Sequence, residues 1–245
     1  MIYQQFAEFY DELFDARLYD RWLSYTEKRV AKSGSLLDLA CGTGRLAIKL
    51  SKAGYLVDGA DLSENMLSIA QQNSSKAGVK INFIQTDMRK MAGIPKYSTI
   101  TCFDDSLCYL IKKRDLFSTF KTVYHHLDQS GIFLFDVITP YQTDIVYPGY
   151  MYNFRNEKSA FMWSSYQGNF GRHCIEHDLS FFDYNSKKNA YDVHNELHQE
   201  RTYKIKKYIK MLKEIGFANI KVTSDFGEKS PKNSDKRWFF ECHKG

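Results

Sequence analysis

The segment LLDLACGTGRLA, residues 36–47, joins an apolar run to a helical pattern through a turn that contains Gly42 and Gly44. An apolar run followed by glycine is typical of a buried strand that ends in a tight turn. Neither glycine has a side chain, so the backbone of this turn can come close to a ligand. The segment therefore predicts a ligand-binding turn between a strand and a helix, without selecting the ligand.

The residues around this turn alternate between strand-like and helix-like patterns. Strand-like runs and helical spacing follow one another near residues 35–39, 44–53, 55–61, 64–76, 80–85, 98–103, 114–127 and 131–136. Such alternation predicts an α/β fold with a doubly wound, mostly parallel sheet that has helices on both faces. At 245 residues, the chain fits one such domain with an insertion.

The alternation is interrupted at residues 139–200, where short strand-like segments are separated by Gly, Asn and Lys turns. They predict an inserted antiparallel β meander, interpreted as a substrate cap. Helical spacing returns at residues 203–215, and the last strands are expected near residues 220–223 and 237–242.

Residues 1–34 place aromatic side chains at helical spacing and predict one or two helices before the first strand. The expected organisation is therefore a ligand-binding domain of residues 1–138 and 201–245. Residues 139–200 form the subdomain inserted into it.

Three carboxylates lie at the ends of consecutive expected strands: Asp38, Asp61 and Asp87. A buried carboxylate at Asp38 would need hydrogen bonds or a cation. Asp61 follows Gly42 by 19 residues, where a carboxylate can accept hydrogen bonds from both ribose hydroxyls. Asp87 could accept a hydrogen bond from an exocyclic amine, with Met88 packed on the ring. Each could instead cap a helix, although Ser63 is a better cap than Asp61.

The turn GTGRLA also satisfies the looser glycine fingerprint of dinucleotide-binding folds. A nicotinamide-dependent oxidoreductase is therefore an alternative. The position of Asp38 within the end of the first strand, and the pair Asp87 and Met88, argue against it.

Together, these motifs resemble those of class I S-adenosylmethionine-dependent methyltransferases of a bacterial small-molecule type. The family's first two motifs are matched by LLDLACGTGRLAIKLSKAGYLVDGADLSENMLSIAQ, and its third motif by INFIQTDMRKM. The fourth strand with the loop after it, the next helix with the fifth strand, the last helix and the final β-hairpin are matched by STITCFDDSLCYL, VYHHLDQSGIFLFDV, LKEIGFANIKV and RWFFECHK. The N-terminal helical lid of the family, expected here in residues 1–34, is matched by YQQFAEFYDELFD with YDRW. The resemblance implies a seven-stranded, mostly parallel sheet whose last strand is antiparallel. The β meander is additional to that sheet.

The resemblance also implies a binding site for S-adenosylmethionine, which leaves as S-adenosylhomocysteine. Asp38, Gly42 and Gly44 would shape the pocket of the methionine part, and Asp61 would hold the ribose. The full set of expected cofactor-binding residues is Tyr10, Arg21, Trp22, Asp38, Ala40, Cys41, Gly42, Gly44, Asp61, Leu62, Met66, Asp87, Met88, Phe103 and Asp104.

The implied activity is methyl transfer to a nitrogen or oxygen nucleophile of a small molecule. No catalytic residue can be assigned; the candidates for a base are Asp104, Asp105 and Tyr109, or His and Tyr residues of the meander. The alternatives are an RNA or protein methyltransferase and a non-catalytic cofactor-binding module. The tetrapeptide DDSL stands where many enzymes that methylate base amino groups have an Asn-Pro-Pro-Tyr-like sequence, which argues against a nucleic-acid substrate without removing it.

Composition adds little on partners. A formal charge of +5 fits a mixed solvated surface better than a nucleic-acid-binding module. Five scattered cysteines suggest reduced thiols, and no apolar run reaches membrane-spanning length, so we expect a soluble cytoplasmic monomer or homodimer. The histidines and glutamates of the meander are interpreted as a solvated sheet face, with no metal expected.

Overall fold

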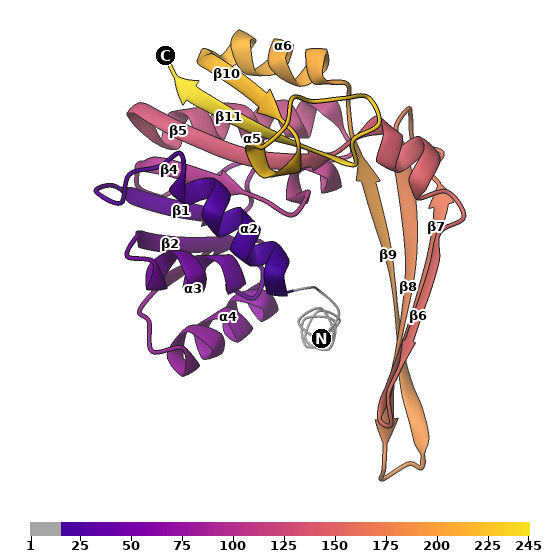
Figure 1. The fold of residues 1–245 in the computed structure, drawn as a ribbon. Helices are drawn as coiled ribbons and strands as arrows, with labels where there is room; N and C mark the ends of the chain where they lie inside the picture. The colour runs from indigo at the N-terminus through magenta and orange to yellow at the C-terminus, as the bar shows by residue number, and fades with distance from the viewer. Residues whose placement is uncertain (1–15) are drawn as a thin grey trace.

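A computed structural model describes residues 16–245 of the chain. Its main sheet has seven strands in the order β10-β11-β5-β4-β1-β2-β3 (Figure 1). Only β11 runs antiparallel to its neighbours within the described part of this sheet. The strands are β1 (Ser35–Leu39), β2 (Leu56–Asp61), β3 (Asn82–Gln85), β4 (Tyr97–Cys102), β5 (Leu127–Ile138), β10 (Phe217–Thr223) and β11 (Arg237–Lys244). The predicted fold class is confirmed.

Helices cover both faces of this sheet because neighbouring residues of each strand point to opposite sides. Leu36 of β1 packs in one hydrophobic cluster, with side chains of α2 (Ala16–Glu27) and α3 (Arg45–Lys52). Leu37 packs in the other, with side chains of α5 (Lys113–His126) and α6 (Ile205–Ile215). Helix α4 (Glu64–Lys76) lies beside α3 (Figure 1).

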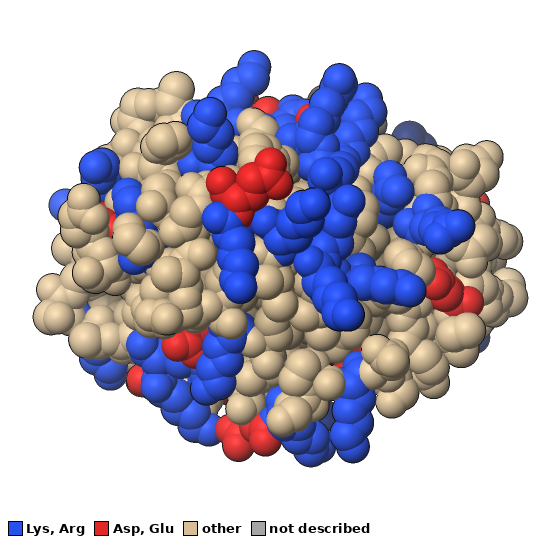
Figure 2. Space-filling model, turned by 90° about the horizontal axis from the view of Figure 1, so that it is seen from above, with Lys and Arg blue, Asp and Glu red and all other residues tan. Residues whose placement is uncertain are grey.

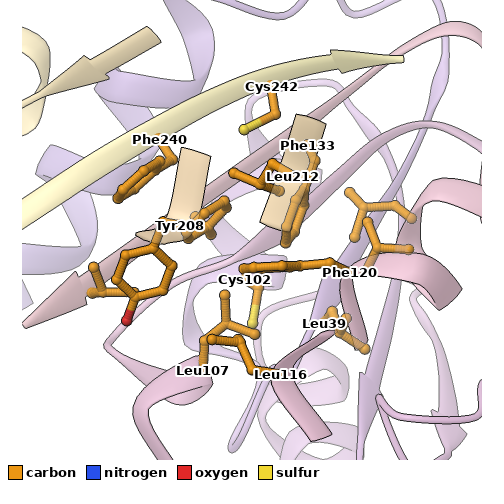
Figure 3. Close-up of a cluster of buried hydrophobic side chains, with 14 of the residues drawn as sticks. Leu39, Cys102, Leu107, Leu116, Phe120, Phe133, Tyr208, Leu212, Phe240 and Cys242 are labelled. Atoms are coloured by element: carbon orange, nitrogen blue, oxygen red, sulfur yellow. The ribbon is translucent and has the colours of Figure 1, made fainter. Parts of the chain in front are cut away.

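The core under α5 and α6 is rich in aromatic rings (Figure 3). Phe120 of α5 packs against Phe133 and Phe135 of β5, with ring centroids 6.2 and 5.5 Å apart. Phe135 stacks on Phe240 of β11 at 4.6 Å. These contacts lock β5 and β11 together, although the two strands are about 100 residues apart in sequence.

A second, four-stranded antiparallel sheet is present where the sequence predicts a meander. It consists of β6 (Met151–Arg155), β7 (Ser159–Gln167), β8 (Cys174–Asn185) and β9 (Ala190–Arg201). The chain enters it through the π-helical segment η2 (Gln142–Val146) and leaves it into α6. In Figure 1 this sheet stands beside the main sheet, at the edge where β4 and β5 end.

Some boundaries differ from those expected. Strand β5 begins at Leu127 rather than at Gly131. Residues 128–130 are polar and exposed, so the sequence shows no strand-like alternation there. Helix α3 begins at Arg45, since Gly44 has a positive φ of 79° and serves as its N-cap. Within the described chain, no helix has both the length and the apolar character needed to span a membrane.

Candidate active site

A cavity of about 560 Å³ opens beyond the carboxyl ends of β1, β2 and β4. That position and size are typical of ligand sites in open α/β sheets. Its walls come from α2, the turn after β1, the end of β2, the segment after β4, and β9. The lining residues are Tyr19, Trp22, Asp38, Ala40, Cys41, Gly42, Thr43, Leu46, Asp61, Leu62, Ser63, Met66, Met88, Phe103, Asp104, Ser106, Tyr109, Leu197, His198 and Gln199.

The two glycines of the turn after β1 have different tasks. Gly42 lines the cavity, and a Cβ built on it would meet no atom of the described structure within 4 Å. A Cβ on Gly44 would lie 3.0 Å from the Cβ of Ala70 and 3.2 Å from the ring of Phe83. Gly42 therefore gives a ligand access to the backbone, whereas Gly44 lets the turn pack against α4 and β3.

Asp61 ties this turn to the end of β2. Its carboxylate accepts hydrogen bonds from the backbone N–H of Gly42 and that of Ser63, both at 2.9 Å. Burial raises the pKa of Asp61, and the two N–H groups oppose that rise. The Ser63 hydroxyl accepts the Met66 N–H at 3.3 Å and caps α4. Asp61 is therefore placed at the cavity and is not the helix cap.

Asp38 is 3% exposed at the end of β1. Its Oδ1 accepts a hydrogen bond of 2.9 Å from the hydroxyl of Thr101 on β4. Burial raises the pKa of Asp38 to about 7; the Thr101 bond opposes this rise and the charge of Asp61 adds to it. The cavity thus contains a carboxyl group that changes charge near neutral pH.

Trp22 fixes α2 over the cavity. Its indole N–H donates to Oδ2 of the buried Asp136 at 2.7 Å, and its ring stacks on Phe103 with centroids 6.2 Å apart. Arg237 of β11 donates to Oδ1 of Asp136 at 2.9 Å and also to Asp105. One buried ion cluster therefore holds α2, β5, β11 and the segment after β4 in place.

The segment after β4 is bent sharply. Asp104 and Asp105 have φ values of 56° and 49°, in the left-handed region that costs a non-glycine residue energy. The Asp105 N–H donates to Asp136 Oδ1 at 2.8 Å, and Arg237 binds the Asp105 carboxylate. These contacts hold the bend, which directs the chain into the short helix η1 (Ser106–Tyr109).

A smaller cavity, of about 110 Å³, adjoins the first and shares Asp104, Tyr109 and His198 with it. It lies between the segment after β4 and the four-stranded sheet. All three residues predicted as candidates for a base line it. The lining residues are Asp104, Asp105, Tyr109, Tyr147, Trp163, His177, Leu179, His198, Glu200 and Arg237.

Most of the predicted cofactor-binding residues are brought together at the larger cavity. Those that line it are Trp22, Asp38, Ala40, Cys41, Gly42, Asp61, Leu62, Met66, Met88, Phe103 and Asp104.

Three of the predicted residues that the structure describes do not line the cavity. Gly44 packs inward, as shown above. The guanidinium of Arg21 pairs with Asp225 and lies 4.0 Å from the ring centroid of Phe226. The carboxylate of Asp87 pairs with Arg89, which lowers the pKa of Asp87. Tyr10 lies outside the described residues.

The interpretation of the meander carboxylates and histidines as one solvated face is wrong for three of them. His177, Glu196 and Glu200 are 3%, 9% and 4% exposed, because this face of the sheet packs toward η1 and η2. Among residues 16–245, no group of three or more His, Cys, Asp or Glu side chains is arranged to hold a metal ion.

The sequence predicts the meander as a substrate cap but does not identify which residues of β9 line the cavities. Leu197, His198 and Gln199 line the larger cavity, and Glu200 lines the smaller one. The only signal in the sequence is that Glu196, His198 and Glu200 alternate with other residues and so share one face of a strand.

Known proteins match this chain over parts or all of its length. The model of a methyltransferase domain family matches residues 36–131. The chain is 37% identical to a methyltransferase-family protein of Geobacillus sp. (strain WCH70), with 100% of both chains covered. It is 40% identical to the methyltransferase-family protein YqeM of Bacillus subtilis (strain 168), covering 100% of this chain and 98% of that protein.

A solved structure extends the likeness to the fold. The S-adenosylmethionine-dependent methyltransferase from Clostridium acetobutylicum ATCC 824 superposes with a TM-score of 0.84 at 28% identity, over 99% of each chain. These relatives match the chain over its whole length, which includes the glycine turn and the acid at the end of β2 that line the larger cavity. The chain belongs to the S-adenosylmethionine-dependent methyltransferases.

Proposed function

We propose that this methyltransferase transfers the methyl group to a nitrogen or oxygen atom of a small molecule that binds in the smaller cavity. The observation that carries the proposal is the adjacency of the two cavities, which meet at Asp104, Tyr109 and His198. A volume of about 110 Å³ admits only the reacting end of an acceptor.

The larger cavity has the groups that S-adenosylmethionine requires. Asp61 would accept hydrogen bonds from the ribose hydroxyls, and Leu62, Met66 and Met88 would flank the adenine. The bare backbone at Gly42 and the carboxyl of Asp38 would bind the methionine part. Phe103 and Asp104, which follow β4, would then lie between the cofactor and the acceptor.

When bound, S-adenosylmethionine supplies a methyl group that is already activated on a sulfonium. The residues of this chain therefore need to align the acceptor with that methyl group and exclude water. Trp22 and Phe103 form an apolar wall on one side, and β9 closes the other. The three-residue junction between the cavities fixes the direction from which an acceptor approaches.

The charge around the cavities supports a small acceptor over RNA. Lys and Arg gather on the face that α6 occupies (Figure 2), where Lys206, Lys207 and Lys210 are exposed. Within the described chain, Arg237 is the single Lys or Arg that lines either cavity, and Asp105 and Asp136 engage it. The basic surface is therefore not part of the walls that would receive the reacting group.

Incubation with S-adenosylmethionine carrying an isotopically labelled methyl group tests the proposal. The acceptors are a low-molecular-weight extract of bacterial cells and, separately, bulk RNA and protein. We expect the label in small molecules, identified by mass spectrometry. Label in RNA or protein alone would contradict the proposal, and binding without any transfer would favour a non-catalytic module.

A further inference from the structure

The smaller cavity carries more negative than positive charge. Asp104, Asp105 and Glu200 line it together with one cation, Arg237. Arg237 contacts Asp105 and the buried Asp136 closely and lies 3.7 Å from Asp104. This single cation is thus surrounded by three aspartates. The remaining acidic wall suits a group that donates hydrogen bonds or becomes cationic, and it repels a carboxylate or phosphate.

Glu200 lacks a hydrogen bond that a ligand could supply. The residue is 4% exposed, and its Oε1 lies 3.8 Å from Nε2 of His177. Its Oε2 is buried and, among residues 16–245, has no hydrogen-bond partner. Leaving a buried oxygen without a hydrogen-bond donor is unfavourable, so native structures rarely retain one without a reason. A donor in the cavity would satisfy it.

His177 does not neutralise Glu200. The Trp163 indole N–H donates to Nδ1 of His177 at 3.1 Å, and the Ser165 hydroxyl lies 2.7 Å from the same nitrogen. The same indole N–H also donates to the Ser165 hydroxyl oxygen at 2.9 Å, so Trp163 and Ser165 together occupy the Nδ1 side of the ring. Burial also lowers the pKa of His177 to about 4, so the ring is neutral at physiological pH.

Aromatic rings form the rest of the wall. The rings of Tyr147 and Trp163 lie 6.2 Å apart, and Tyr147 lies 4.8 Å from the ring of His177. Tyr109 is held by its hydroxyl, 3.0 Å from Nδ1 of His198, whose Nε2 lies 2.7 Å from Glu196. Aromatic faces next to carboxylates are a favourable environment for an ammonium group.

We propose that the acceptor is an amine, and that Glu200 binds its N–H and takes the proton it loses. The lone pair of the amine nitrogen forms a bond to the methyl carbon while the carbon–sulfur bond breaks, and that electron pair remains on sulfur. The proton released from nitrogen passes to the Glu200 carboxylate. This inference rests on the proposed function, because it assigns the acceptor class of the same cavity.

The surroundings of Glu200 suit a base. Burial and the charges of Asp105 and Asp104 raise the pKa of Glu200 well above the ordinary value, and Arg237 and the Tyr109 hydroxyl oppose that rise. In its ionised form, a carboxylate with a raised pKa is a stronger proton acceptor than an ordinary carboxylate. The other titratable groups that line the cavity are Asp104, Tyr109, Tyr147, His177 and His198.

The test compares the wild-type protein with Glu200→Gln, which keeps the size of the side chain and removes the base. Both are assayed with labelled S-adenosylmethionine and a panel of small amines and matched alcohols, together with the low-molecular-weight extract. Calorimetry measures cofactor affinity for each variant and shows whether its fold and larger cavity are intact. Glu157→Gln, on the exposed turn between β6 and β7, is the matched control.

We expect N-methylated products, a fall in kcat/KM of about 10²-fold or more in Glu200→Gln, unchanged cofactor affinity and a shifted pH profile. Glu157→Gln should behave as wild type. Methylation of alcohols but not amines would overturn the inference and leave the proposed function standing. Amine methylation that Glu200→Gln leaves unchanged would overturn the role of Glu200. Label confined to RNA or protein would instead contradict the proposed function itself.

Discussion

We expect Asp38 to couple S-adenosylmethionine binding to pH. Its pKa of about 7 in the free protein means that it is partly protonated at neutral pH. The methionine part of the cofactor carries cationic groups, which would favour the ionised carboxylate and lower this pKa. Binding should then release a proton, and affinity should rise as pH increases from about 5.5 to 7.5. Calorimetry in buffers of different ionisation enthalpy checks this; Asp38→Asn should flatten the dependence, and a falling affinity would contradict it.

Gly44 and Gly42 should respond differently to alanine, although both have positive φ values. Gly44→Ala combines that conformation with close contacts to Ala70 and Phe83, and we expect a loss of about 2–4 kcal/mol in the free energy of unfolding. Gly42→Ala has room for its methyl group and should lose about 1–2 kcal/mol, with weaker cofactor binding. Urea unfolding measures the free energy of unfolding of both variants. Equal losses would contradict the inference that Gly44 is needed for packing and Gly42 for ligand access.

The ion cluster of Arg237 should stabilise the elements around the site. Arg237→Met leaves Asp136 buried without its main cation, and breaking such a pair typically costs about 3–5 kcal/mol. Burial already raises the pKa of Asp136, and Arg237 opposes that rise. As the pH rises above the ordinary range of carboxyl pKa values, the free energy of unfolding of Arg237→Met should therefore fall further below that of the wild type. Adding Asp136→Asn should restore part of the loss in urea unfolding, and strictly additive losses would argue against coupling.

The elements differ in how far the sequence could predict them. Strands β1, β2 and β4 are short and mostly buried; Asp61 ends β2, and Gly42 and Asp104 follow β1 and β4 within three residues. Their succession along the chain follows the predicted alternation with helices. The turn after β1 and the acid at the end of β2 were predicted because local sequence determines both. Arg21 and Asp87 were placed at the cofactor, but their partners Asp225 and Arg89 hold them outside the cavity lining.

Strand β9 shows why the rest of the site could not be predicted. Glu196 and Glu200 are polar, and polar alternation in a strand normally indicates a solvated face. Their burial depends on η1 and η2, which come from segments far away in sequence. The buried cluster of Asp136 and Arg237 likewise joins residues 101 positions apart. Such contacts depend on how the two sheets are placed, which no local pattern determines.

The molecule as a whole separates its basic surface from its cavities. Lysines crowd on the face of α6, where the charges of Lys113 and Lys210 lower the pKa of Lys207. A nucleic-acid substrate would release counterions and make activity fall steeply with salt. The smaller cavity, where we propose that the acceptor binds, has one lining cation, Arg237, which is paired with aspartates. We therefore expect kcat/KM for a small acceptor to change less than about threefold between about 50 and 200 mM salt. A fall of about 10³-fold would favour nucleic-acid docking.

Titration of the purified protein with S-adenosylmethionine, alongside Asp61→Ala, tests the assignment of the larger cavity most directly. S-adenosylhomocysteine and NAD are measured in parallel, with Asp128→Ala as a control for charge on an exposed residue. We predict micromolar binding of both sulfur compounds, none of NAD, and about 10- to 100-fold weaker binding in Asp61→Ala, as expected for lost hydrogen bonds to a charged group. Unchanged affinity in Asp61→Ala, or tight binding of NAD, would contradict the account.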